Sequence, residues 1–166
     1  AYKNAKKVIK LTRCDAVKLE GGTKIVSIIK HLVKRKIPVM GHIGLLPQTS
    51  KKFKVKGKNS IQKNKILKDA LAVSKSGAFA IVVECVVQNL AKTITKKVLI
   101  PTIGIGASKY CDGQILVTED MLGLNDVSPK FVKKYVNLNK VVDKSIKNYV
   151  RDVKMKRFPS TKYAYK

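Results

Sequence analysis

The sequence is poor in acidic residues and cysteine, and it contains no tryptophan. The three cysteines, Cys14, Cys85 and Cys111, lie far apart and form no CxxC pair or Cys–His cluster, which argues against a zinc site and a disulfide framework. No apolar run approaches the roughly 18 residues of a membrane span, and the N-terminus shows no signal-peptide pattern. The sequence therefore predicts a cytoplasmic protein that has no membrane partner.

The few acidic residues leave a large positive charge. Only 10 Asp and Glu stand against 36 Lys and Arg, a formal net charge of +26. A basic surface is the usual feature of a nucleic-acid-binding protein, so this alternative function has to be weighed. The excess is almost all lysine and is spread along the chain, whereas arginine suits bidentate phosphate contacts. No basic strand carries the aromatic residues that stack bases, so we do not expect a nucleic-acid partner.

Short β-branched segments alternate with helical patterns along the chain. Apolar segments predict strands at 16–20, 37–40, 78–83, 100–105 and 114–117. Apolar residues at helical spacing predict helices around 25–33, 66–73, 90–94 and 141–153. This alternation is typical of a parallel α/β fold, but periodicity does not separate a barrel from an open doubly wound sheet. No linker or internal boundary is visible, so we expect residues 1–166 to form a single domain.

The strand at 16–20 carries two candidate site residues, Lys18 and Glu20. Side chains alternate along a strand, so these two face one side while Val17 and Leu19 face the other. Opposite charges at the end of a strand, followed by two glycines, suit the mouth of a barrel, where active sites lie. A solvated charge pair on an exposed edge strand explains the same pattern equally well.

Glu84 and His42 also follow predicted strands. Glu84 ends the apolar segment at 78–83, a position that suits a general base, although a loop carboxylate outside the sheet is the alternative. His42 lies between glycines, which allow the backbone to approach a ligand closely, but a lone histidine is more often structural. Gly104-Ile105-Gly106 is too short for a dinucleotide-binding fingerprint.

Taken in order, several segments resemble the ketopantoate hydroxymethyltransferase family, also called 3-methyl-2-oxobutanoate hydroxymethyltransferase. The segments that carry the resemblance are 15–22 (DAVKLEGG), 38–48 (PVMGHIGLLPQ), 53–58 (FKVKGK), 79–86 (FAIVVECV), 100–123 (IPTIGIGASKYCDGQILVTEDMLG), 129–135 (PKFVKKY) and 158–159 (FP). Each is weak alone, but together they cover essentially the whole chain. The match is to the C-terminal two-thirds of the family.

The resemblance implies a (β/α)₈ barrel, with about five of its eight strands in this chain. It also implies bound Mg²⁺, 5,10-methylenetetrahydrofolate as one-carbon donor, 3-methyl-2-oxobutanoate as acceptor, and a homo-oligomer. The product would be 2-dehydropantoate, in pantothenate biosynthesis. By motif, Lys18 would hold the oxo acid, Glu20 would belong to the metal site and Glu84 would be the general base. His42 would line the same site.

The chain departs from the family pattern at several points. Val87 stands where the family has a proline, and Leu46 stands where it has a threonine. No segment matches the family's first three strands, which complete the metal and substrate site. We therefore expect little or no activity from this chain alone. An inactive fragment, or a remnant that only assembles with partners, is the alternative function.

Overall fold

The computed structural model describes residues 1–50 and 53–165. The chain divides into two compact units, Ala1–Ile115 and Leu116–Lys166, and each is described here by itself. The single domain expected over residues 1–166 stays a prediction. Within the described ranges, every helix is too short or too polar to cross a membrane.

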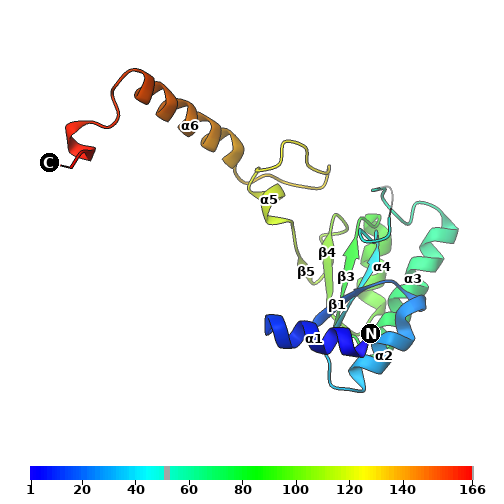
Figure 1. Ribbon diagram of the computed structural model, residues 1–166. Coiled ribbons are helices and arrows are strands. Elements are labelled where there is room, and N and C mark those ends of the chain that lie inside the picture. Colours follow the sequence, from blue (N-terminus) through cyan, green and yellow to red (C-terminus); the bar gives the residue numbers. More distant parts are fainter. Residues whose placement is uncertain (51–52, 166) are drawn as a thin grey trace. The chain divides into compact units, whose positions relative to one another are not determined.

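The first unit is built on five parallel strands (Figure 1). They are β1 (Val17–Glu20), β2 (Val39–Gly44), β3 (Ala80–Glu84), β4 (Thr102–Ile105) and β5 (Gly113–Gln114). The accompanying helices are α1 (Tyr2–Thr12), η1 (Thr23–Ile25), α2 (Val26–Val33), α3 (Ser60–Lys75) and α4 (Gln88–Lys97). The strands lie side by side in chain order, and each neighbouring pair is parallel. The predicted parallel α/β fold is confirmed.

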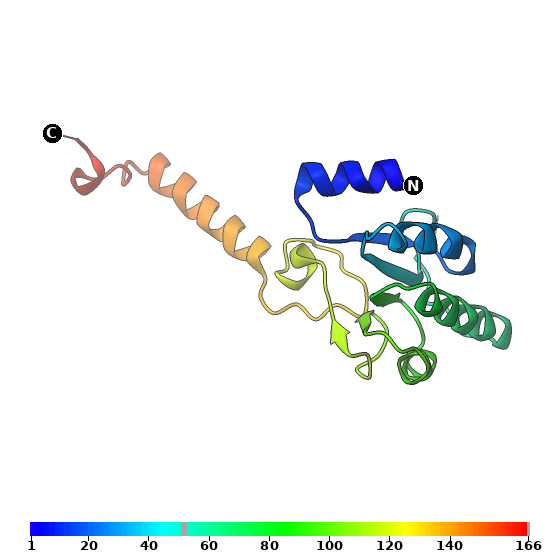
Figure 2. The same ribbon diagram turned by 90° about the horizontal axis from the view of Figure 1, so that it is seen from below.

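The helices cover one face of the sheet. Core-facing strand residues alternate along each strand, for example Val39 and Ile43 on β2 and Ile81 and Val83 on β3. The helices contribute to the same core with Ala5, Ile29, Leu32, Ile66, Ala70, Val73, Leu90, Ala91 and Ile94. Figure 2 shows α2, α3 and α4 along the same side of the strands. In a (β/α)₈ barrel the strands follow one another in chain order and the helices form a single outer layer, as they do here. In a doubly wound sheet the strand order reverses at one point and helices cover both faces of the sheet.

The fifth strand is shorter than the sequence predicts. We expected it at 114–117, but β5 covers only Gly113–Gln114. Its partner β4 ends at Ile105, and Gly106 turns the chain away with φ of +59°. The last hydrogen bond between the two segments runs from the Ile115 amide to the Gly104 carbonyl (3.0 Å). Because β4 has ended, residues 116–117 have no neighbouring strand residues to pair with.

Asp112 ties the start of β5 to the start of β4. Its Oδ2 accepts hydrogen bonds from the Thr102 amide (2.8 Å) and from the Thr102 hydroxyl (2.9 Å). These bonds, the backbone one first, hold the pKa of the Asp112 carboxyl below its ordinary value because they favour the charged form. The turn at 112–113, which the sequence marks only as Asp-Gly, is thereby fixed to the sheet.

We expect Asp112→Asn to lower the free energy of unfolding at neutral pH by about 1 kcal/mol, since the two hydrogen bonds from Thr102 lose the negative charge of their acceptor on a largely exposed side chain. A depressed folded-state pKa stabilises the fold above the unfolded-state value of about 3.9. That stabilisation disappears as the pH falls through the folded-state pKa. Urea denaturation of parent and variant across acid pH should therefore converge. A difference that stays constant below about pH 2 would contradict this account.

The second unit contains α5 (Thr118–Met121), α6 (Leu138–Lys154) and η2 (Thr161–Tyr163). The Asn137 side chain caps α6 by accepting a hydrogen bond from the Lys140 amide (3.1 Å). The predicted helix at 141–153 is confirmed, and none of its residues is buried. Its exposed apolar stripe consists of Val141, Val142, Ile146, Tyr149, Val150 and Val153.

Candidate active site

The carboxyl ends of β1, β2 and β3 bring three ionisable side chains together. Glu20 on β1 pairs with His42 on β2, and Glu84 on β3 pairs with Gly44, the next β2 residue on the same face. His42 Nε2 lies 3.1 Å from Glu84 Oε2. His42 Nδ1 lies 3.9 Å from Glu20 Oε1. A single imidazole therefore lies between two carboxylates.

This cluster is shielded from solvent. The side chain of His42 is 1% exposed, that of Glu20 8% and that of Glu84 13%. Neither ring nitrogen of His42 has an aligned hydrogen-bond partner among the described residues, so the contact with Glu84 is close but is not a well-aligned hydrogen bond. Buried polar groups are nearly always satisfied, and the exceptions are explained by strain, by a catalytic role or by a bound water or ion.

Glu20 is held by the loop that follows β2. Its Oε2 accepts a hydrogen bond from the Gln48 amide (3.1 Å), and the Gly21 amide donates to the His42 carbonyl (3.0 Å). These two bonds continue the contact between β1 and β2 beyond the last strand residue. They fix the Glu20 carboxylate with Oε1 on the side of His42.

Lys18 lies on the same face of β1 as Glu20. Val17 and Leu19 pack against the helix-covered core, which places the two charged residues on the opposite face, as the alternation predicts. Lys18 pairs in register with Met40 and is exposed. Among the described residues it forms no ion pair, so its ammonium group is available to an anion.

The glycines beside His42 serve packing within the protein, and the interpretation that they let the backbone approach a ligand stays a prediction. A Cβ on Gly41 would lie 2.3 Å from Cγ1 of Val73, because α3 packs directly on β2 there. Gly44 has φ of +92°, and a Cβ there would lie 2.2 Å from the Glu84 carbonyl oxygen. Both glycines allow close contact within the protein: Gly41 lets α3 pack against β2, and Gly44 lets β2 approach the backbone of Glu84.

Cys85 is a positioning feature that sequence reasoning missed. Its φ of +50° is uncommon for a residue other than glycine, and it turns the backbone immediately after Glu84. The Cys85 amide donates to the Ile105 carbonyl (2.9 Å), and its carbonyl accepts from the Lys56 amide (2.7 Å). Burial, and then the adjacent Glu84 carboxylate, raise the pKa of the Cys85 thiol. The thiol is therefore protonated at neutral pH and is not a nucleophile.

The residues present do not by themselves fit a Mg²⁺ ion. The described part of the chain contains no group of three or more His, Cys, Asp or Glu placed to hold a metal. Mg²⁺ requires near-octahedral oxygen coordination. Glu20 offers one carboxylate, and one of its oxygens already accepts the Gln48 amide.

Barrel-type winding with charged side chains at the carboxyl ends of the strands defines an α/β enzyme scaffold. Comparison with known proteins narrows this class. A family model described as ketopantoate hydroxymethyltransferase matches residues 1–161. The chain belongs to this family, as the sequence segments indicated.

Three relatives illustrate the similarity, and each is named 3-methyl-2-oxobutanoate hydroxymethyltransferase. The protein of Pelagibacter ubique is 52% identical over 165 residues, which cover 99% of this chain and 64% of the relative. That of Clostridium kluyveri is 51% identical over 170 residues, covering 100% and 61%. That of Hyphomonas neptunium is 49% identical over 168 residues, covering 99% and 61%. The chain thus spans a little over three-fifths of the length of these relatives.

Proposed function

We propose that the protein carrying this chain transfers a hydroxymethyl group from 5,10-methylenetetrahydrofolate to 3-methyl-2-oxobutanoate. The product is 2-dehydropantoate, a precursor of pantothenate. The observation that supports this most is the shielded Glu20–His42–Glu84 cluster at the strand ends, with Lys18 on the same face. The names of the relatives support the hydroxymethyl transfer and the 2-oxo acid.

Glu84 acts as the general base in this proposal. The C3 proton of the oxo acid is adjacent to a carbonyl, so its removal gives an enolate. A carboxylate that is largely shielded from water, and held at a strand end by the turn at Cys85, is suited to taking that proton. The enolate carbon then bonds to the methylene carbon of the folate. Water supplies the hydroxyl group as the bonds from that carbon to the two folate nitrogens break, and these nitrogens take up the proton that Glu84 removed and the second proton of the water.

Lys18 supplies positive charge to the same reaction. Its ammonium group lies on the face that carries Glu20 and forms no ion pair among the described residues. We propose that it binds the anionic oxo acid and stabilises the negative charge that develops on the enolate oxygen. Glu84 removes the proton while Lys18 compensates the resulting charge.

Glu20 is the proposed ligand of the Mg²⁺ that the family resemblance implies. Its carboxylate would supply one oxygen ligand, and the described part of the chain holds no cluster of His, Cys, Asp or Glu that completes the site. The homo-oligomer and the cytoplasmic location also stay predictions. The absence of a nucleic-acid partner is likewise a prediction.

The proposal is tested by incubating the full-length protein with Mg²⁺, the oxo acid and the folate and following 2-dehydropantoate by mass spectrometry. Exchange of the C3 proton in D₂O, measured by proton NMR without folate, isolates the enolisation step. We expect both exchange and product formation. A folded protein that catalyses neither would refute the proposed function.

His42→Gln is expected to lower the rate of C3 exchange about 10²-fold, with the KM for the oxo acid changed less than about threefold. The ring contacts Glu84, and misplacing a reacting group by about 1 Å costs that much. His31→Gln is the matched control, because His31 is the chain's other histidine and lies exposed on α2. A KM that rises as much as kcat falls would instead place His42 in contact with substrate.

A further inference from the structure

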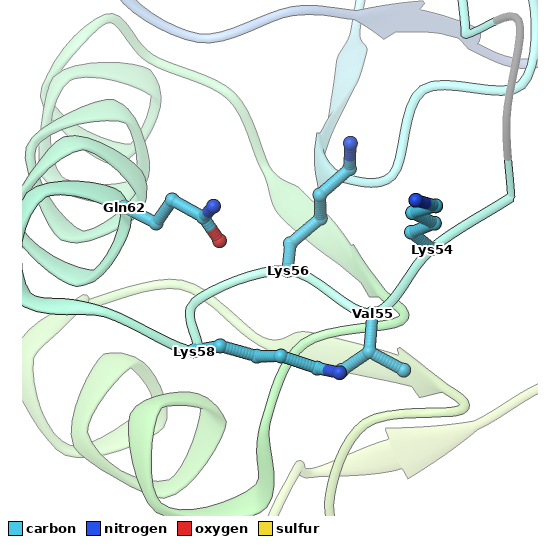
Figure 3. A pocket seen from close by; sticks show the side chains of 5 residues that line it. All are labelled: Lys54, Val55, Lys56, Lys58 and Gln62. Carbon is cyan, nitrogen blue, oxygen red and sulfur yellow. The ribbon is translucent and has the colours of Figure 1, made fainter.

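Three lysines line one cavity formed by the segment that is hydrogen-bonded to the backbone after Glu84. The cavity has a volume of about 510 Å³ and is lined by Lys54, Val55, Lys56, Lys58 and Gln62 (Figure 3). A neighbouring cavity of about 510 Å³ shares Lys58 and adds Lys63. No aspartate or glutamate lines either of the two cavities. We call the first of these, with its five lining residues, the lysine pocket.

The backbone of the lysine pocket is fixed by hydrogen bonds. The Lys56 amide donates to the Cys85 carbonyl (2.7 Å), and the Val87 amide donates to the Lys56 carbonyl (3.1 Å). The Gly57 amide donates to Gln62 Oε1 at the start of α3 (3.0 Å). Because Cys85 follows Glu84 directly, the segment that carries the lysines is attached to the residue that positions the proposed base.

The charge in the lysine pocket is not compensated within the described part of the chain. None of the ion pairs there includes Lys54, Lys56 or Lys58. Like charges around a hollow repel one another, and a cleft lined by one sign of charge raises the local concentration of the opposite ion. An anion with several negative charges removes this repulsion more effectively than a single carboxylate does.

We propose that the lysine pocket binds a small molecule that carries two or more carboxylates, as the anionic end of the co-substrate. This assignment rests on the proposed function, since a reduced folate ends in glutamyl carboxylates. The segment that forms the lysine pocket is bonded to Cys85 and Val87, which closely follow Glu84 in the chain, so we place the charged end of the co-substrate beside the site of its reacting carbon. Lysine, a flexible point charge, suits carboxylates whose number and position vary.

The test uses the full-length protein and the peptide triglutamate as probe, with binding measured by isothermal titration calorimetry at a fixed salt concentration. Lys54→Gln, Lys56→Gln and Lys58→Gln are combined in one variant. We expect its Kd for triglutamate to rise about tenfold, because each partly exposed ion pair contributes a fraction of a tenfold change. Lys58→Gln alone should raise the Kd about twofold, and this single variant keeps the test valid if the triple variant unfolds.

The matched control removes three exposed lysines of α1, through Lys3→Gln, Lys7→Gln and Lys10→Gln, and should change the Kd less than about twofold. Equal weakening in both triple variants would overturn the pocket, because net charge alone would then explain binding. Tighter binding of pyrophosphate than of triglutamate would overturn the carboxylate assignment. Displacement of triglutamate by single-stranded DNA at lower concentration would indicate a nucleic-acid site instead.

The same preparation separates this inference from the proposed function. If the parent protein exchanges the C3 proton but the two triple variants bind triglutamate alike, the lysine pocket alone is refuted. If the lysine-pocket variant loses triglutamate binding but the parent exchanges no C3 proton, the proposed reaction alone is refuted.

Discussion

Glu84→Gln should lower the rate of C3 proton exchange about 10³-fold in the full-length protein, and product formation should fall with it. The amide that replaces the carboxylate has nearly the same shape but cannot accept the proton, and a positioned general base contributes between about 10² and 10⁴ in rate. The proposed substrate carboxylate is held by Lys18 and not by Glu84. We therefore expect the Kd of the oxo acid to change less than about threefold.

Glu119→Gln is the control for this prediction, because Glu119 is an exposed carboxylate at the start of α5. Exchange is followed by loss of the C3 proton signal in D₂O, and the Kd by titration calorimetry in the absence of folate. If Glu84→Gln abolishes binding and not exchange, the side chain is a substrate ligand and another group is the base.

The sequence predicted the elements better than it predicted their arrangement. The strands β2 to β4 are local features, because their short length, β-branched residues and flanking glycines favour strand over helix. The barrel-type winding is not local. It depends on which face of the sheet α2, α3 and α4 cover, and amphipathic periodicity is the same for either face. The family resemblance indicates the barrel, whereas the hydrophobic periodicity of the sequence does not.

The site shows the same division between local and long-range information. Alternation along one strand correctly placed Lys18 and Glu20 on one face. The approach of His42 to Glu20 and Glu84 depends on register between strands that are far apart in sequence. A slip of one residue would turn His42 toward the core. No residue pattern in the sequence signals the register that brings His42 between the two carboxylates.

Two further features had no usable signal in the sequence. The left-handed backbone at Cys85 falls on a residue type that seldom adopts it, so composition gives no hint of the turn that holds Glu84. In the sequence, the lysines of segment 53–58 cannot be distinguished from the many other lysines of the chain. They become a pocket only because Lys56 pairs with the backbone after β3, through an isolated bridge to Val86. Contacts between distant segments, and not charge alone, distinguish these lysines from the rest.

Lys18→Met is expected to lower kcat/KM for the oxo acid about 10²-fold, since it removes the cation that we propose to bind the substrate and to stabilise the enolate. Methionine keeps the unbranched length of the side chain without its charge. Lys18→Arg should restore part of the activity, because it returns the charge with a different geometry. Lys30→Met, on the exposed surface of α2, is the control and should leave the kinetics within about twofold.

Combining Lys18→Met with Glu84→Gln then tests whether the two residues act on the same intermediate. If the base creates the charge that Lys18 stabilises, the cation has little to stabilise once the base is absent. The double variant should therefore be only slightly slower in C3 exchange than Glu84→Gln alone, with a combined loss well below the product of the single losses. Fully multiplicative losses would mean that Lys18 and Glu84 contribute to separate steps. Lys18 would then serve to bind the substrate, without a role in stabilising the enolate.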